Sequence, residues 1–377
     1  MEQKKLPDPF MGPDGTRITS PAEWPAQKEY LMDMLDHFLY GPMPPQSEKV
    51  SGTVIKSEKI YNAAIAETVK INCGKFHFEA SIKRPDKPGK FPVVCGYTME
   101  PVFGTKSFPA EQEALCERDY VLATINVNAI AFDKGEGGGP IYDAYPEFSG
   151  KAIMAWSWGI MRLNDYLLQC DFIDPKMLIA AGCSRLGKQT ICTALHDERI
   201  ALAGVAGSGC GGFGSFRILG TLKDGQTQDS TKMETIGRMS QVFPHWFSEN
   251  MLPFGSPQSP HPVLNEYRLP FDMHFARACL APRYVLTSNA LEDTWGNLYG
   301  DWGTYLAAQE LYQFLEAEDN AAFFYRPGTH RYDESEFLAL LDFADAKLRG
   351  LSPKGFANLN KAVFTADKKA FFDWERP

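Results

Sequence analysis

The stretch MLIAAGCSRLGKQTICTAL, residues 177–195, decides the fold of this chain. An apolar run typical of a buried strand leads into Gly182-Cys183-Ser184, and residues typical of a helix follow directly. A serine at the apex of a strand–turn–helix indicates a nucleophile elbow, in which small flanking residues let the backbone turn sharply. The alternative interpretation is an ordinary serine that caps a helix. The motif also departs from G-x-S-x-G, because Leu186 takes the last glycine position.

Apolar runs alternate with helical patterns on both sides of this elbow, which predicts a mostly parallel central sheet with helices on both faces. Together with the elbow, this arrangement predicts an α/β-hydrolase fold. Helices are predicted from the capping box at Ser20 to the stop at Gly41, and over residues 153–168 and 333–350. Strands are predicted around a turn within residues 69–85, and at 91–97, 120–126, 177–182, 201–209, 282–290 and 321–327.

The pattern predicts a single α/β-hydrolase domain over residues 1–377. It has an N-terminal helical extension over about residues 1–50. Residues 218–270 are poor in strand signals and rich in Gly, Pro, Ser and Gln, so we expect an insertion over the active-site end of the sheet.

Composition and charge disfavour some classes of binding partner. The chain has 377 residues and a net charge of −9, which disfavours a nucleic-acid partner. It contains no apolar stretch of membrane-spanning length and no N-terminal signal peptide, so we expect no membrane partner. We expect a cytoplasmic protein, or a secreted one whose signal peptide has been removed.

Metal and cofactor motifs are also missing from the sequence. The cysteines form no C-x-x-C pair and the histidines no H-E-x-x-H motif, so we expect no metal and no cofactor. The glycine-rich run AFDKGEGGGP, residues 131–140, matches neither phosphate-binding spacing and is predicted to be a surface loop.

A nucleophilic serine needs a histidine base, and the histidine needs an acid to orient it. His330 follows the last predicted strand and precedes the final helix, the position that this fold gives to its histidine. Asp293 follows the preceding strand and is our candidate for the acid, with the neighbouring Glu292 as the competing candidate. Adjacent residues of an extended segment point to opposite sides, so only one of the two should face His330.

Several motifs together resemble the glucuronoyl esterases of carbohydrate esterase family 15. The likeness covers nearly the whole chain and includes GCSRLGK with the upstream AWSWGIMRLNDYL and the downstream GSGCGG. It also includes DPFMGPDGTRITSPAEW, YGPMPP, FPHWF and GTHRYDESEFLALLDFADAKL. The resemblance implies hydrolysis of esters between (4-O-methyl-)glucuronic acid on xylan and alcohols of lignin, without metal or cofactor.

The same resemblance implies roles for individual residues. By similarity Ser184 is the nucleophile, His330 the general base, and Arg185 a side chain that stabilises the oxyanion. Lys188 would contact hydroxyls of the uronate ring and Trp295 would line the sugar site. Glu234 is similar to the acid that binds sugar hydroxyls in the family.

Two positions depart from the family pattern. Many members carry the acid of the triad as a glutamate at the start of the GSGCGG motif, where this chain has Gly207. The fungal branch joins a cysteine beside the serine to one beside the histidine. Cys183 is present, but Arg331 follows His330, so that disulfide cannot form here.

The charges near the elbow agree with a uronate ester as substrate. Arg185 and Lys188 follow the serine by one and four residues in an acidic chain, and they suit an anionic intermediate and a carboxylate product. As plain N-terminal helix residues they would be electrostatically disfavoured. We therefore predict a glucuronoyl esterase with a Ser184–His330–Asp293 triad. The alternatives are a carbohydrate acetyl esterase or general carboxylesterase, and a non-catalytic carbohydrate-binding protein that lost the acid at position 207.

Overall fold

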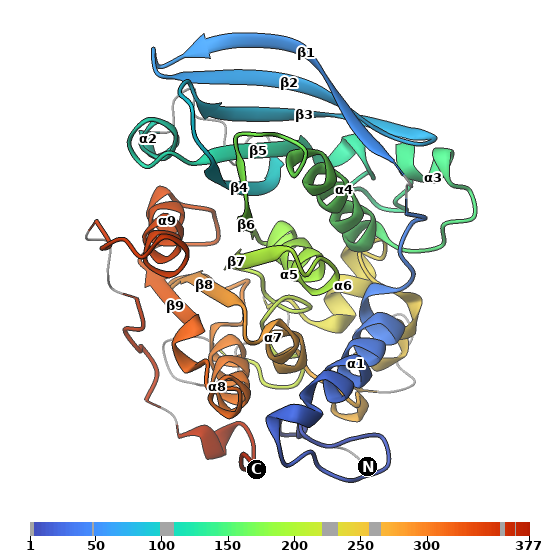
Figure 1. The fold of residues 1–377 in the computed structure, drawn as a ribbon. Helices are drawn as coiled ribbons and strands as arrows, with labels where there is room; N and C mark the ends of the chain where they lie inside the picture. The colour runs from blue at the N-terminus through green and yellow to red at the C-terminus, as the bar shows by residue number, and fades with distance from the viewer. Residues whose placement is uncertain are drawn as a thin grey trace.

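The strands of the chain form one large sheet in the computed structural model (Figure 1). The structure describes residues 4–46, 49–98, 109–220, 233–255, 265–354, 359–365 and 367–377. In these residues the strand order is β1-β2-β3-β5-β4-β6-β7-β8-β9. The strands are β1 (Val50–Ile60), β2 (Ala64–Cys73), β3 (Phe76–Pro85), β4 (Phe91–Thr98), β5 (Val121–Asn126), β6 (Ile173–Cys183), β7 (Ile200–Ala206), β8 (Tyr284–Ala290) and β9 (Ala321–Arg326).

The two halves of the sheet differ in direction. From β5 through β4, β6, β7 and β8 to β9 every neighbouring pair is parallel, which confirms the predicted mostly parallel sheet. β1, β2 and β3 pair antiparallel, and β3 joins the parallel part by an antiparallel pairing with β5. The short turns between the first three strands require this, because parallel neighbours need a longer crossover connection.

Helices cover both faces of the parallel part. Figure 1 shows α4 and α5 on one face and α9 on the other, so successive side chains of the strands between them enter different cores. Val93 and Ala203 pack in the core beneath α4 and α5, whereas Val94 and Leu202 pack with α9. The longer helices are α1 (Trp24–Leu35), α4 (Ala152–Leu167), α5 (Arg185–His196), α8 (Leu298–Phe314) and α9 (Glu334–Arg349). The shorter ones are α2 (Pro109–Gln112), α3 (Pro140–Ala144), α6 (Ile236–Val242) and α7 (His274–Leu280).

The N-terminal helical segment begins and ends where its sequence signals predict. The Ser20–Glu23 capping box is formed, and the turn η1 (Pro21–Glu23) leads directly into α1. A wider turn, η2 (Asp36–Tyr40), extends α1 until Gly41, whose φ of 71° ends the helix.

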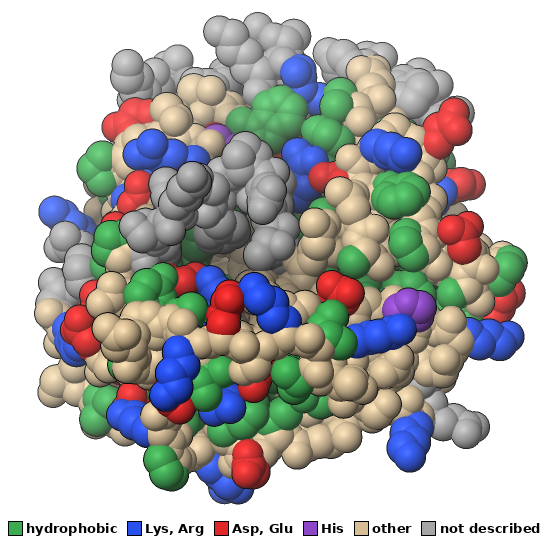
Figure 2. Space-filling model, turned by 90° about the horizontal axis from the view of Figure 1, so that it is seen from above, with side chains coloured by type: hydrophobic (Ala, Val, Ile, Leu, Met, Phe, Trp, Pro, Cys, Tyr) green, Lys and Arg blue, Asp and Glu red, His purple; other side chains and the backbone are tan. Residues whose placement is uncertain are grey.

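The predicted insertion over residues 218–270 is described only in part, because residues 221–232 and 256–264 lie outside the described residues. Its described residues form α6 and the short turns η5 (Glu249–Phe254) and η6 (Glu266–Arg268). In the part of the chain that is described, no helix has the length and apolar character needed to cross a bilayer. Basic and acidic side chains intermingle on the face seen from the side of β1 (Figure 2).

Candidate active site

Ser184 stands at the sharp turn between β6 and α5. Its φ of 58° and ψ of −125° are unusual for a residue with a side chain, as expected for a strained nucleophile elbow. The Ser184 N–H donates to the carbonyl of Ala206 on β7 at 2.9 Å, which ties the turn to the neighbouring strand. A Cβ on Gly182 would lie 2.4 Å from the carbonyl oxygen of Leu186, so the turn closes only around a glycine.

His330 lies in the loop between β9 and α9, and its ring reaches Ser184. Its Nε2 is 2.9 Å from Ser184 Oγ, and about a third of its side chain, 30%, is exposed. The buried Arg326 holds the loop, since its guanidinium donates to the carbonyls of Pro327, Thr329 and Arg331. The His330 ring is therefore held by a rigid strand end and a cross-linked loop.

Asp293 faces the other ring nitrogen of His330. Its Oδ2 is 2.7 Å from His330 Nδ1, and its Oδ1 accepts the backbone N–H groups of Trp295 and Gly296, both at 2.9 Å. Burial acts to raise the pKa of Asp293, but hydrogen bonds from His330 and these two N–H groups, with the histidine charge, outweigh it and lower the pKa. A carboxylate can only accept at Nδ1, which leaves Nε2 to accept the Ser184 hydroxyl proton.

Glu292 points elsewhere. Its side chain accepts the backbone N–H of Gly328, and its own N–H donates to the Gly328 carbonyl at 3.0 Å. It therefore clamps the loop that carries His330, and in the described part of the chain its hydrogen bonds go to Gly328 and not to the ring. The two acids lie in a turn after β8 and not in the extended segment that the sequence analysis assumed, and of the two it is Asp293 that contacts the ring.

Gly207, at the end of β7, borders the same histidine ring. A Cβ built on it would lie 3.7 Å from Cε1 of His330 and 3.8 Å from Nδ1, and its φ is 47°. A side chain at this position would thus point toward the nitrogen that Asp293 contacts.

Three further predicted residues lie together. Lys188, 1% exposed, donates from Nζ to the carbonyl of Ser208 at 2.6 Å and to Glu234 Oε2 at 2.7 Å. The Glu234 N–H donates to the carbonyl of Trp295 at 3.2 Å, which connects the ion pair to the loop that follows Asp293. Among the described residues, the buried Glu234 Oε1 has no hydrogen-bond partner.

Arg185 lies beside an acid that the sequence analysis missed. Its Nη1 donates to Asp133 Oδ2 at 2.5 Å, and its guanidinium lies 4.9 Å from the ring centre of Trp246. Asp133 belongs to the glycine-rich run that was predicted only as a surface loop. The available signal was an acid shortly after a buried parallel strand, at the end of the sheet where the elbow also opens.

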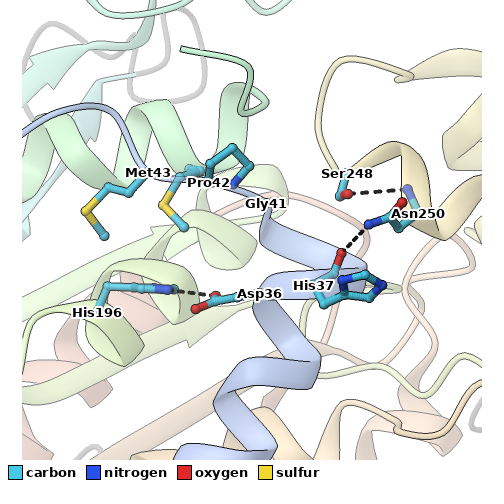
Figure 3. Close-up of a pocket in the computed structure, with 9 residues that line it drawn as sticks. Asp36, His37, Gly41, Pro42, Met43, His196, Ser248 and Asn250 are labelled. Atoms are coloured by element: carbon cyan, nitrogen blue, oxygen red, sulfur yellow. Dashed lines mark hydrogen bonds and ion pairs between the residues drawn. The ribbon is translucent and has the colours of Figure 1, made fainter. Parts of the chain in front are cut away.

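A cavity of about 430 Å³ lies apart from these residues (Figure 3). Its wall includes His196, which ends α5, whereas Ser184 precedes the first residue of the same helix. Twelve helical residues separate the two by about 18 Å. The lining consists of Asp36, His37, Gly41, Pro42, Met43, Met154, His196, Ser248 and Asn250.

Comparison with known proteins shows the family of this chain. A sequence model described as "Glucuronyl esterase, fungi" matches residues 68–316, a range that contains Ser184, Asp293 and Glu234. This chain belongs to the glucuronyl esterase family. The match ends before His330, so the family model does not cover that residue.

Individual relatives agree with this membership. The 4-O-methyl-glucuronoyl methylesterase of Podospora anserina is 30% identical over 84% of this chain, which spans 61% of that protein's length. A carbohydrate esterase family 15 glucuronoyl esterase from Caldicellulosiruptor kristjansonii superposes with a TM-score of 0.79 at 27% identity, covering 99% of this chain and 97% of its own.

A second solved structure holds a sugar ester. It is a mutant of the glucuronoyl esterase from Sporotrichum thermophile in complex with methyl 4-O-methyl-β-D-glucopyranuronate. It superposes with a TM-score of 0.72 at 25% identity and covers 94% of this chain and 90% of its own. As a glucuronyl esterase this chain keeps Cys183 beside the serine, and Cys183 is a free, buried thiol.

Proposed function

We propose that this chain hydrolyses esters of glucuronic acid, including the 4-O-methyl sugar, with Ser184 as nucleophile, His330 as general base and Asp293 as the acid that orients it. The observation that carries the proposal is the continuous chain of contacts from Asp293 Oδ2 through His330 to Ser184 Oγ, at 2.7 and 2.9 Å. These separations are within hydrogen-bond reach, which is what proton transfer to a base requires.

In the proposed reaction, Ser184 Oγ attacks the ester carbonyl while His330 Nε2 takes its proton. The tetrahedral intermediate carries a negative oxygen, which the Arg185 guanidinium stabilises. The C–O bond to the alcohol then breaks, and His330 returns the proton to the leaving alcohol. Water repeats the sequence on the acyl-enzyme, with His330 again as base, and releases glucuronic acid and free Ser184.

The buried pair of Lys188 and Glu234 supports a hydroxyl-rich acyl group. An acceptor without a partner in a buried position costs about 1–3 kcal/mol, and a sugar hydroxyl would satisfy Glu234 Oε1. Trp295 is partly exposed and its carbonyl accepts the Glu234 N–H, so its ring is the candidate for stacking on a sugar face, with Arg238 lying 4.9 Å from the ring centre. A simple acetyl or long acyl group would use neither feature.

The binding-protein alternative depended on the missing acid at position 207. Asp293 lies at the place where that acid would act, 2.7 Å from His330 Nδ1, which argues for turnover rather than binding alone.

The test compares two kinds of ester under the same conditions. We expect kcat/KM on benzyl glucuronate to exceed that on 4-nitrophenyl acetate and on acetylated xylose, because only the uronate engages Lys188 and Glu234. Ser184→Ala, assayed in parallel, controls for turnover by contaminants. A preference for the acetyl esters would contradict the proposal and favour the carboxylesterase alternative. Binding of the sugar without turnover would contradict it and favour the binding-protein alternative.

A further inference from the structure

Asp133 is a partly buried acid at the edge of the site, and three donors converge on it. Its side chain is 13% exposed. Arg185 Nη1 donates to its Oδ2 at 2.5 Å, while Trp246 Nε1 at 3.0 Å and His245 Nε2 at 3.1 Å contact its Oδ1. Both carboxylate oxygens of Asp133 therefore have hydrogen-bond partners. All of these partners come from other segments of the chain.

The carboxylate stays charged at every pH where an esterase would be assayed. Burial acts to raise the pKa of Asp133, but hydrogen bonds from His245 and Trp246 and the charge and hydrogen bond of Arg185 outweigh it, so the pKa falls to about 2. Arg185 consequently has a fixed negative partner throughout that range.

Arg185 is held on its flat side as well. Its guanidinium carbon lies 4.9 Å from the ring centre of Trp246 and 5.2 Å from that of Phe243, and these two rings are stacked 3.8 Å apart. One nitrogen is fixed by Asp133, whereas the buried Nε has no hydrogen-bond partner among the described residues. The guanidinium is thus fixed in place while donors remain for another acceptor.

We propose that Asp133 is a positioning residue that holds Arg185 in the orientation in which it stabilises the oxyanion, acting through Arg185 and not on the substrate. This inference rests on the proposed function, which gives Arg185 its role. A free arginine side chain samples many rotamers, and a donor that must be reoriented during the reaction contributes less than one already in place. A purely structural Asp133 would instead only tie its loop to His245 and Trp246.

The test is a double-mutant cycle between Asp133→Asn and Arg185→Ala on a glucuronate ester. Arg185→Ala should lower kcat by about 10²–10³-fold if it removes one oxyanion donor. Asp133→Asn should lower kcat by about 10–100-fold with KM changed less than about threefold, since only the geometry of the transition state is disturbed. In the Arg185→Ala background, Asp133→Asn should have almost no further effect.

Equal losses from Asp133→Asn in both backgrounds would overturn the proposal, as would a change confined to KM. Glu249→Gln is the matched control, because it also removes one carboxylate charge but from an exposed pair with Lys151, and kcat should not change. Asp133→Glu keeps the charge at a shifted position and should recover part of the kcat lost in Asp133→Asn. Thermal midpoints of all variants reveal any that fail to fold. If Asp133→Asn is among them, Asp133→Glu replaces it in the double-mutant cycle.

A measurement without substrate separates this inference from the proposed function. If wild type hydrolyses no glucuronate ester, the proposed function fails, and the cycle is run on whichever ester it does hydrolyse. In either case ¹⁵N NMR of the Arg185 guanidinium should show slow exchange of its Nη protons in wild type and fast exchange in Asp133→Asn. The same exchange in both proteins would overturn the positioning role.

Discussion

The ends of β7 and β8 both lie against His330, but only one supplies a carboxylate. The chain leaves β7 at Gly207, where an added Cβ would lie 3.8 Å from His330 Nδ1. It leaves β8 toward Asp293, whose Oδ2 is 2.7 Å from the same nitrogen. The two strands are parallel neighbours, so their carboxyl ends necessarily meet at one edge of the sheet.

This difference shows that the fold fixes where a carboxylate must lie to contact His330 Nδ1. It does not fix which strand end supplies that carboxylate. An orienting acid needs only an oxygen at Nδ1 and N–H groups to stabilise its charge after burial. The turn after β8 provides both, because the N–H groups of Trp295 and Gly296 donate to the second oxygen of Asp293. We therefore expect catalysis in this chain to need no acid at the end of β7.

Removing the nucleophile has the largest expected effect. This effect does not depend on whether the acid comes from the end of β7 or of β8. Ser184→Ala should abolish ester hydrolysis, since no other group can form the acyl-enzyme. The fold should persist, because the substitution removes one oxygen from a partly buried turn. Steady-state assays and a thermal unfolding scan check the two statements. Turnover like that of wild type would end the serine-esterase account, whichever acid assists.

Changing the acid at the end of β8 should have the next largest effect. Asp293→Asn should lower kcat by about 10⁴-fold, because an amide at this position can stabilise the wrong imidazole tautomer and no longer balances the imidazolium charge. Glu292→Gln is the matched control one residue earlier, and its kcat should stay within about twofold of wild type, since the amide oxygen of Gln can still accept the Gly328 N–H that clamps the loop. The reverse ranking of the two variants would assign the role to Glu292.

Moving the acid to the end of β7 sharpens the comparison directly. In the Asp293→Asn background, Gly207→Glu should recover about tenfold in kcat, because the new side chain starts beside His330 Nδ1. Recovery should be partial, since the φ of 47° at this position strains any residue other than glycine. Gly207→Ala in the same background is the control and should recover nothing. Equal activity of the two double variants would show that a carboxylate at the end of β7 cannot orient His330.

The smallest expected effect is a pH signature of the buried acid. The pKa of Asp293 is lowered in the folded state, so its ion contributes stability above the unfolded pKa of about 3.9 and loses that contribution as the pH falls below it. The stability that wild type gains from this ion should therefore disappear between about pH 4 and the folded pKa. Thermal midpoints of wild type and Asp293→Asn, followed from pH 6 to pH 3, should converge; a constant or widening gap contradicts the assignment.

Much of the site could be predicted because its residues are marked by their places in the chain. Ser184 follows a buried strand and begins a helix, and His330 and Asp293 each follow later strands, so a parallel sheet gathers all of them at one edge. Strand β1 escaped prediction because it is an edge strand whose side chains are mostly exposed, so it carries no apolar alternation.

Contacts between separate loops could not be predicted in the same way. Asp133 reaches Arg185, and Trp246 lies against both, only because two loops meet the start of α5 in space. No local spacing in the sequence encodes that meeting, and a lone acid in a glycine-rich run is usually just solvated. The sequence showed the glycines around Asp133, but it did not show that Arg185 is its partner.

The contact between His330 and Asp293 is the central claim, and proton NMR tests it without turnover. A proton held between an imidazole nitrogen and a carboxylate oxygen resonates far downfield of the backbone amides. We expect such a signal in wild type, its retention in Glu292→Gln, and its loss in Asp293→Asn. The same downfield signal in Asp293→Asn, or its loss in Glu292→Gln alone, would contradict the account.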